Sequence, residues 1–185
     1  MNLLHLKPDY IEIITWNDYG ESSYIGPAQS TPPAQLAASK TYYAGLDHTA
    51  FLAMAKIFIA AYKAGDEKPV IRPADEQVFL YYRLQPAQTN GATDSLPLPK
   101  NTAEVSNNVF VISFLAQPAT ITVTTGGQQK ALSYPAVVGR GIHTFGTGKV
   151  KLSMNRALGS GETLSKSGPD VQGGFDKYQG NVVAI

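Results

Sequence analysis

An almost continuous apolar run occupies residues 10–16, which read Tyr-Ile-Glu-Ile-Ile-Thr-Trp. A run without polar alternation predicts a strand buried on both faces, as in parallel sheets that helices cover on both sides. Glu12 interrupts the run, and a carboxylate inside such a strand must be paired or must face a polar cavity, because burying it alone is too costly. We therefore expect a buried strand here, in which Glu12 is paired or faces a polar cavity.

A helix is predicted after a long polar connection that occupies residues 26–45 and is rich in Pro, Ser, Gln and Ala. Asp47 suits the N-cap position, and Ala64-Gly65 is a normal C-terminal stop. Between these ends apolar residues nearly encircle the axis and leave Lys56 and Lys63 as the clearly polar positions. A helix of this kind is normally covered on more than one side.

Short apolar or alternating runs separated by Gly, Pro and Asn fill the second half of the chain. They predict strands at residues 77–84, 108–115, 119–124, 130–134, 141–145 and 149–154, with a last edge strand at 182–185. Residues 155–180 are predicted to be a loop because they are rich in Gly, Ser and Asp. Short strands with frequent turn signals favour an antiparallel sandwich.

The predicted fold class is therefore mainly β, with one long helix in the N-terminal half. We expect two regions, a strand, loop and helix at residues 1–70 and an antiparallel β-sandwich domain at residues 75–185. A chain of 185 residues with 43% hydrophobic content suits one domain, or one domain with a partial neighbour attached.

Composition excludes several classes of function. The formal net charge is +1 and no Lys/Arg cluster exceeds two residues, so we expect neither nucleic acid nor an anionic membrane as partner. The absence of cysteine excludes disulfides and thiol catalysis, and we see no metal-ligand spacing and expect no cofactor. The longest apolar-rich stretch, residues 49–62, is too short to span a membrane, and no signal peptide is visible at the N-terminus.

The strongest candidate for chemistry follows the first apolar run, where Trp16-Asn17-Asp18-Tyr19-Gly20-Glu21-Ser22 stands. This string resembles the last barrel strand and following loop of glycoside hydrolase family 71, the fungal α-1,3-glucanases or mutanases. The likeness continues through Leu46-Asp47-His48 and the helix that ends at Gly65, and becomes diffuse in the β-rich half. Members usually have His after the Glu-Ser pair, whereas this chain has Ser23.

The resemblance implies an inverting endo-hydrolase of α-1,3-glucan, secreted, on a (β/α)₈ barrel of which this chain holds a strand–loop remnant. Asp18 and Glu21 match the catalytic carboxylates of the family. Inversion needs one carboxylic acid to protonate the leaving oxygen and one carboxylate to activate water, roughly 6.5–9.5 Å apart. Trp16, Asn17, Tyr19 and His48 are the expected substrate-binding residues.

Other interpretations remain open for the same residues. Acidic residues and Gly after a strand often only make a turn or cap a helix. His48 suits a capping or packing role as well as a place in the substrate cleft. Because a (β/α)₈ barrel takes about 250 residues, we expect the isolated chain to be weakly active or inactive.

Two further functions compete with hydrolysis. One is a non-catalytic, lectin-like β-sandwich that binds a polysaccharide or a cell-surface glycan. The other is a structural domain that forms a homodimer, because the apolar helix needs cover on more than one side.

Overall fold

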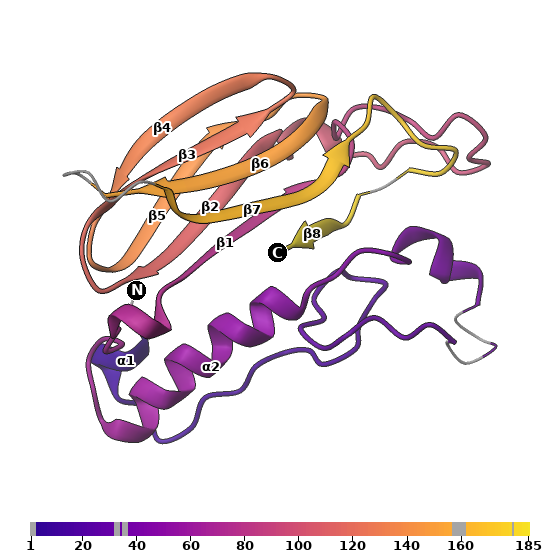
Figure 1. The fold of residues 1–185 in the computed structure, drawn as a ribbon. Helices are drawn as coiled ribbons and strands as arrows, with labels where there is room; N and C mark the ends of the chain where they lie inside the picture. Colours follow the sequence, from indigo (N-terminus) through magenta and orange to yellow (C-terminus); the bar gives the residue numbers. More distant parts are fainter. Residues whose placement is uncertain (1–2, 32–33, 35–36, 157–161, 179) are drawn as a thin grey trace.

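The computed structural model describes residues 3–31, 34, 37–156, 162–178 and 180–185, and its strands form two four-stranded sheets. Sheet A has the order β5-β2-β1-β8, and sheet B has the order β4-β3-β6-β7, with antiparallel pairing throughout. The strands are β1 (Gln77–Arg83), β2 (Asn108–Leu115), β3 (Ala119–Thr125), β4 (Gln128–Tyr134), β5 (Val137–Thr144), β6 (Gly148–Asn155), β7 (Glu162–Val171) and β8 (Val182–Ala184). Figure 1 shows the two sheets stacked on one another, which confirms the predicted sandwich.

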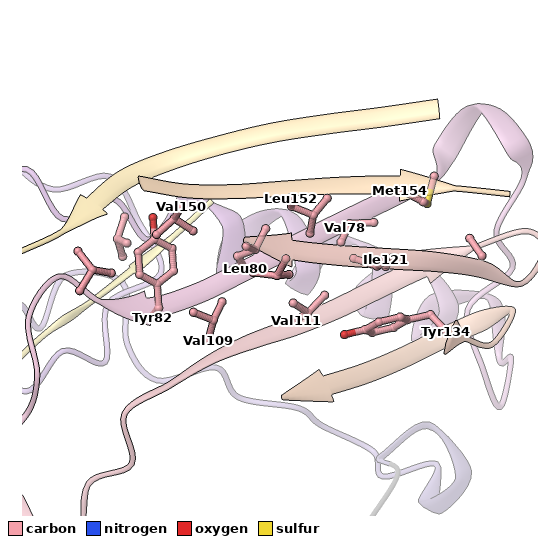
Figure 2. Close-up of a cluster of buried hydrophobic side chains, with 14 of the residues drawn as sticks. Val78, Leu80, Tyr82, Val109, Val111, Ile121, Tyr134, Val150, Leu152 and Met154 are labelled. Atoms are coloured by element: carbon pink, nitrogen blue, oxygen red, sulfur yellow. The ribbon is translucent and has the colours of Figure 1, made fainter. Parts of the chain in front are cut away.

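The main core lies between the sheets and is built mostly from alternate residues of β1, β2, β3 and β6. Val78, Leu80 and Tyr82 of β1 face Ile121 of β3 and Leu152 of β6, and all five are nearly inaccessible to solvent (Figure 2). The neighbours of Leu152 on β6, Lys151 and Ser153, are exposed or half-buried. The alternation that predicted a half-buried strand at 149–154 is therefore confirmed.

Helix α2 (Thr49–Ala64) forms a third layer on the other face of sheet A (Figure 1). Its Ala50 and Met54 pack against Phe79, Phe114 and Ala184 in a second buried cluster. On another side of the helix the Tyr62 hydroxyl donates to the carbonyls of residues 8 and 9, at 2.7 and 2.9 Å. Both the sheet and the N-terminal segment therefore cover the apolar helix.

The ends of α2 follow the sequence prediction with one difference. Gly65 has a φ of 76°, the left-handed conformation that glycine adopts without a Cβ penalty, and its N–H bonds the Tyr62 carbonyl. At the other end the N-cap is His48, one residue later than predicted. Asp47 still satisfies the helix start, because its Oδ1 accepts the Thr49 N–H at 2.8 Å.

The prediction of a buried strand at residues 10–16 is wrong. The segment has no strand assignment, and Tyr10, Ile14 and Trp16 are 91%, 68% and 58% exposed. Its side chains favour a strand, but a strand buried on both faces needs neighbouring strands, and within the described residues the segment pairs only near its end, at Thr15 and Trp16. Glu12 is exposed as well, so it needs no buried partner.

The prediction of a loop over residues 155–180 is also wrong in part. Strand β7 runs from Glu162 to Val171 and pairs with β6. The last strand, β8, lies at an edge of sheet A as expected. The short helices are α1 (Leu3–Leu6) and the 3₁₀ turns η2 (Ala38–Tyr42), η3 (Pro73–Asp75) and η4 (Thr102–Glu104). Over the described part of the chain, each helix falls short of the length and apolar character that a membrane crossing requires.

Candidate active-site loop

The predicted acidic motif forms the tip of a loop whose two arms are hydrogen-bonded. The Thr15 N–H donates to the Ser23 carbonyl and the Ile25 N–H donates to the Thr15 carbonyl, both at 3.0 Å. The Gly26 N–H bonds the Trp16 carbonyl at 3.1 Å. Residues 18–22 therefore form a short turn, and the paired arms hold it at its base.

Asp18 is the better fixed of the two predicted carboxylates. Its N–H donates to Thr15 Oγ1 at 2.9 Å, and its Oδ1 accepts the Glu21 N–H at 3.2 Å. Asp18 is half-buried, whereas Glu21 is exposed. The turn thus presents two carboxyl groups on one short piece of backbone, one oriented by hydrogen bonds and one free to meet a solvated partner. The bond from the Glu21 N–H to Asp18 is also the bond that an ordinary acidic turn makes.

Trp16 and Asn17 lie beside the turn and are both exposed. The Trp16 ring passes close over Gly26, where a Cβ would lie 2.8 Å from the ring, so the ring needs a glycine beneath it. With 58% of its surface accessible, Trp16 offers an apolar face to a ligand. Aromatic faces of this kind supply large contact area at low entropic cost, which suits stacking on a sugar ring.

Tyr19 is placed differently from its predicted role. Its side chain is only 4% exposed and stacks on Tyr43 with ring centroids 4.4 Å apart. Tyr24 meets Tyr19 edge to face at 4.9 Å. These three tyrosines form a buried cluster behind the turn, so in this arrangement Tyr19 supports the loop from within.

The His48 side chain is fully buried. Its ring stacks in parallel on Tyr24, with centroids 3.8 Å apart and an interplanar angle of 4°. Both ring nitrogens lie within hydrogen-bonding distance of backbone carbonyls, Nδ1 of Tyr24 at 2.8 Å and Nε2 of Val182 at 2.7 Å. In the present arrangement the ring does not reach a surface where a sugar could bind.

An open hollow of about 480 Å³ adjoins the loop. Residues 27–30 form one side of it, and Lys40, residues 44–47 and Thr49 form the rest. Tyr19 fastens the first side, because its hydroxyl donates to the Pro27 carbonyl at 3.3 Å and accepts the Gln29 N–H at 3.2 Å. The turn and the hollow are therefore linked through the same buried tyrosine.

Metal chemistry has no visible support in the described part of the chain, where no three His, Asp or Glu residues gather as metal ligands would. Sequence reasoning did not identify Tyr24 and Tyr43 as supports of the loop. Tyr43 lies in a polar connection without periodicity, and its contact with Tyr19 spans 24 positions of the sequence. No local pattern signals such a contact.

Comparison with known proteins identifies a family over nearly the whole chain. The family model described as glycosyl hydrolase family 71 matches residues 1–184. A glucan endo-1,3-alpha-glucosidase of Schizosaccharomyces pombe is 35% identical over 179 residues, which cover 97% of this chain and 41% of the relative. A mutanase of Penicillium rubens is 34% identical over 183 residues, covering 97% of this chain and 40% of the relative.

A third relative, an ascus wall endo-1,3-alpha-glucanase of Schizosaccharomyces pombe, is 30% identical over 130 residues, covering 69% of this chain and 30% of the relative. No solved structure matches the chain. The chain spans about two fifths of the length of the first two relatives.

Proposed function

The chain belongs to glycosyl hydrolase family 71, and from this membership we propose that its acidic loop serves the hydrolysis of α-1,3-glucan. Asp18 and Glu21 are the proposed catalytic carboxylates of an inverting reaction. One protonates the leaving glycosidic oxygen and the other activates a water molecule on the opposite face of the sugar. The relatives named as α-1,3-glucanases support the choice of substrate.

One observation carries the proposal: both carboxyl groups stand on a single short turn with a buried aromatic support. Asp18 is oriented through Thr15 and through the Glu21 N–H, while Glu21 extends into solvent. Behind the turn, the stacked pair Tyr19 and Tyr43 keeps the backbone in place. A fixed carboxylate next to a solvent-facing one is a suitable arrangement for a reaction that consumes water, because the acid and base roles require different environments.

The isolated chain is expected to cleave α-1,3-glucan weakly or not at all. It covers 41% of the Schizosaccharomyces pombe glucosidase and 40% of the Penicillium rubens mutanase. Sugar-binding groups outside the matched region of those relatives have no counterpart among the 185 residues of this chain. Catalysis depends strongly on how the substrate is held, since positioning contributes several kcal/mol (about 7–11 in favourable cases) to the lowering of a barrier. We therefore expect binding of glucan to be easier to detect than turnover.

The test combines binding and cleavage on insoluble α-1,3-glucan. Pure protein is incubated with the polysaccharide, the bound fraction is measured by sedimentation, and released oligosaccharides are measured as reducing ends. Asp18→Asn and Glu21→Gln should keep most of the binding, because both substitutions preserve shape, and should abolish any residual release. Glu104→Gln, a change at an exposed carboxylate on η4, is the matched control. Protein that neither binds nor cleaves α-1,3-glucan would contradict the proposal.

A non-catalytic glucan-binding role is the second candidate, and the exposure of Trp16 favours it. An indole ring that is 58% accessible is suited to stacking on a sugar ring. Trp16→Ala should lower retention on the polysaccharide about two- to tenfold, since a lost stacking contact costs roughly 0.5–1.5 kcal/mol in comparable aromatic contacts. Leu96→Ala removes a similarly exposed apolar side chain and should leave retention unchanged.

Self-association and an extracellular location complete the proposal. Apolar side chains are exposed along the N-terminal segment, among them Leu3, Leu6, Tyr10 and Ile14. Exposed apolar side chains along one segment favour burial against a second copy. Light scattering at micromolar concentration should give a dimer mass, and a monomer mass would contradict this.

The name of the ascus wall relative is the support for an extracellular location.

A further inference from the structure

His48 joins three segments that are far apart in the sequence. It lies at the N-cap of α2, its ring stacks on Tyr24 of the acidic loop, and Nε2 lies 2.7 Å from the carbonyl of Val182 on β8, 134 positions away. Phe51 closes a further side of the ring, edge to face at 5.3 Å. The imidazole is therefore the connection between the loop, the helix and the sandwich.

The two hydrogen bonds of His48 constrain its protonation. Tyr24 and Val182 both offer carbonyl oxygens, which accept hydrogen bonds and cannot donate them. A neutral imidazole carries one N–H, so it would direct the lone pair of its other nitrogen at a carbonyl oxygen less than 3 Å away. The imidazolium form has an N–H on each nitrogen and satisfies both carbonyls. A ring nitrogen and a carbonyl oxygen that face each other without a shared proton in a fully buried site would cost free energy.

The surroundings of the ring favour a positive charge in other ways. The face of Tyr24 lies parallel to it at 3.8 Å, close enough for a cation–π attraction. Asp47 precedes His48 in the chain and supplies a negative charge on the same segment. The Tyr24 phenol donates to the Leu46 carbonyl at 2.8 Å, and burial, with Asp47 as a lesser cause, raises its pKa and keeps it neutral.

Burial of the ring and the like charge of Arg83 oppose the imidazolium, and the two donated hydrogen bonds offset them. Phe51 of α2 and Val182 of β8 carry no titratable side chain. Arg83 pairs with Val182 in the register of β1 and β8, but its guanidinium donates to the carbonyls of Gly180 and Ser106, at 3.0 and 3.2 Å. Arg83 is thus engaged with the loops that follow β7 and precede β2.

We propose that His48 is a positioning residue held as an imidazolium, which clamps the acidic loop to the edge strand of the sandwich through two donated hydrogen bonds. A neutral ring could donate only one of the two bonds and would hold the loop less firmly. The clamp itself stands on geometry; its consequence for catalysis rests on the proposed function of Asp18 and Glu21.

The contacts that lead from the clamp to the carboxylates are short. Tyr24 meets Tyr19 edge to face at 4.9 Å, and Tyr19 follows Asp18 directly in the sequence. The arm that carries Tyr24 is also bonded to the other arm, through the Ile25 N–H and the Thr15 carbonyl. Thr15 in turn accepts the Asp18 N–H on its hydroxyl. A displaced Tyr24 therefore moves the groups that orient Asp18.

Nitrogen NMR of the histidine rings tests the clamp directly. The chain has three histidines, and long-range ¹H–¹⁵N spectra of protein labelled in histidine distinguish an imidazolium from each neutral tautomer. At pH 7 His48 should show protons on both nitrogens, with the resonances assigned by their loss in His48→Phe. His143 is the internal control, because its bonds fit a neutral ring. A single protonated nitrogen on His48 at pH 7 would overturn the proposal.

Amide exchange measures what the clamp holds. In His48→Phe, which keeps an aromatic ring, the protection of the Ile25 and Ala184 amides should fall roughly tenfold, while the amides of β3 and β6 keep theirs. His143→Phe, the matched control on β5, should leave Ile25 unchanged. Unaltered protection at Ile25 in His48→Phe would contradict the clamp. If His48→Phe does not fold, the spectrum of the unmodified protein still decides.

These results separate the clamp from the function. An imidazolium at His48 in a protein that neither binds nor cleaves glucan leaves the clamp and removes the proposed function. Glucan binding by a protein whose His48 is neutral supports the proposed function and overturns the clamp.

Discussion

At the scale of residues, Tyr134 and His143 form a buried pair that joins the two sheets. The Tyr134 hydroxyl on β4 lies 2.8 Å from Nε2 of His143 on β5, and Nδ1 lies 3.1 Å from the Lys130 carbonyl. Because the carbonyl only accepts, Nδ1 carries the proton and Nε2 accepts from the tyrosine. The imidazole ring is neutral in this arrangement. Gly141 leaves space for the Tyr134 hydroxyl, since a Cβ at position 141 would overlap the Tyr134 oxygen.

Burial lowers the pKa of His143 below its ordinary value of 6.5, although the bond to the Lys130 carbonyl acts in the opposite direction. The unfolded chain therefore takes up a proton first as the pH falls. The contribution of His143 to the free energy of unfolding is fully present above pH 6.5 and is lost as the pH falls toward the lower folded value, by at most about 1.4 kcal/mol per pH unit.

The measurement is the free energy of unfolding by urea between pH 8 and pH 5, for the unmodified protein and His143→Phe. Their difference isolates His143 from the other titrating groups. It should be constant from about pH 8 to 7 and should then change in favour of the variant as the pH falls. A difference that is flat down to pH 5 would show that the folded protein protonates His143 as readily as the unfolded chain.

The residues of the candidate site show where sequence reasoning ends. The motif from Trp16 to Ser22 was sufficient to predict an acidic loop, and the structure has a turn there with Asp18 half-buried. The roles of Tyr19 and His48 depend on Tyr43 and on Val182, which lie 24 and 134 positions away. A local pattern contains no information on such partners.

At the scale of elements, the strands that alternate or carry dense apolar runs were predictable, and β7 was not. β7 contains Lys166, Gly168 and Pro169, which are poor strand formers in a sheet interior. It lies at the edge of sheet B, where one side of the backbone needs no partner, so these residues are tolerated. The reverse error occurred at residues 10–16, where strong strand propensity stands without neighbouring strands in the described chain.

Two substitutions separate the contributions of packing and backbone conformation at this scale. Leu152→Ala removes a fully buried side chain between the sheets and should lower the free energy of unfolding by about 2–5 kcal/mol. Gly65→Ala places a Cβ in open space but at a φ of 76°, and should cost about 1–2 kcal/mol from backbone strain alone. Both are measured by urea denaturation.

The control for both is Leu96→Ala, at a leucine that is 59% exposed, which should change the free energy of unfolding by less than about 0.5 kcal/mol. An equal loss in Leu152→Ala and Leu96→Ala would contradict the core between the sheets.

At the scale of the whole molecule, contacts cross the boundary between the two predicted regions, residues 1–70 and 75–185. Leu46 is part of the core between the sheets, and the Asp47 carbonyl accepts the Ala184 N–H at 2.8 Å. Tyr42 bonds Asp94 through its hydroxyl and accepts from Asn181 on its carbonyl. Together with the packing of α2 on sheet A, these contacts bind both regions into a single cooperative structure.

We therefore expect one unfolding transition. In differential scanning calorimetry the calorimetric enthalpy should equal the van't Hoff enthalpy, which is the test of a two-state transition. Tyr42→Phe removes only the bond to Asp94 and should shift the single peak without dividing it. Two peaks in the unmodified protein would indicate that the predicted regions unfold independently.

The residues that made β7 read as a loop in the sequence also affect how molecules of this protein associate at high concentration. A free sheet edge is a template on which the strands of other molecules can add, and this growth is the first step toward aggregates. β7 offers a proline that lacks an N–H at position 169, a lysine at position 166 and irregular register against β6, and its Pro169 carbonyl is already engaged by the Tyr82 hydroxyl. Sheet B thus ends in a strand that is unsuited to extension by a neighbouring molecule.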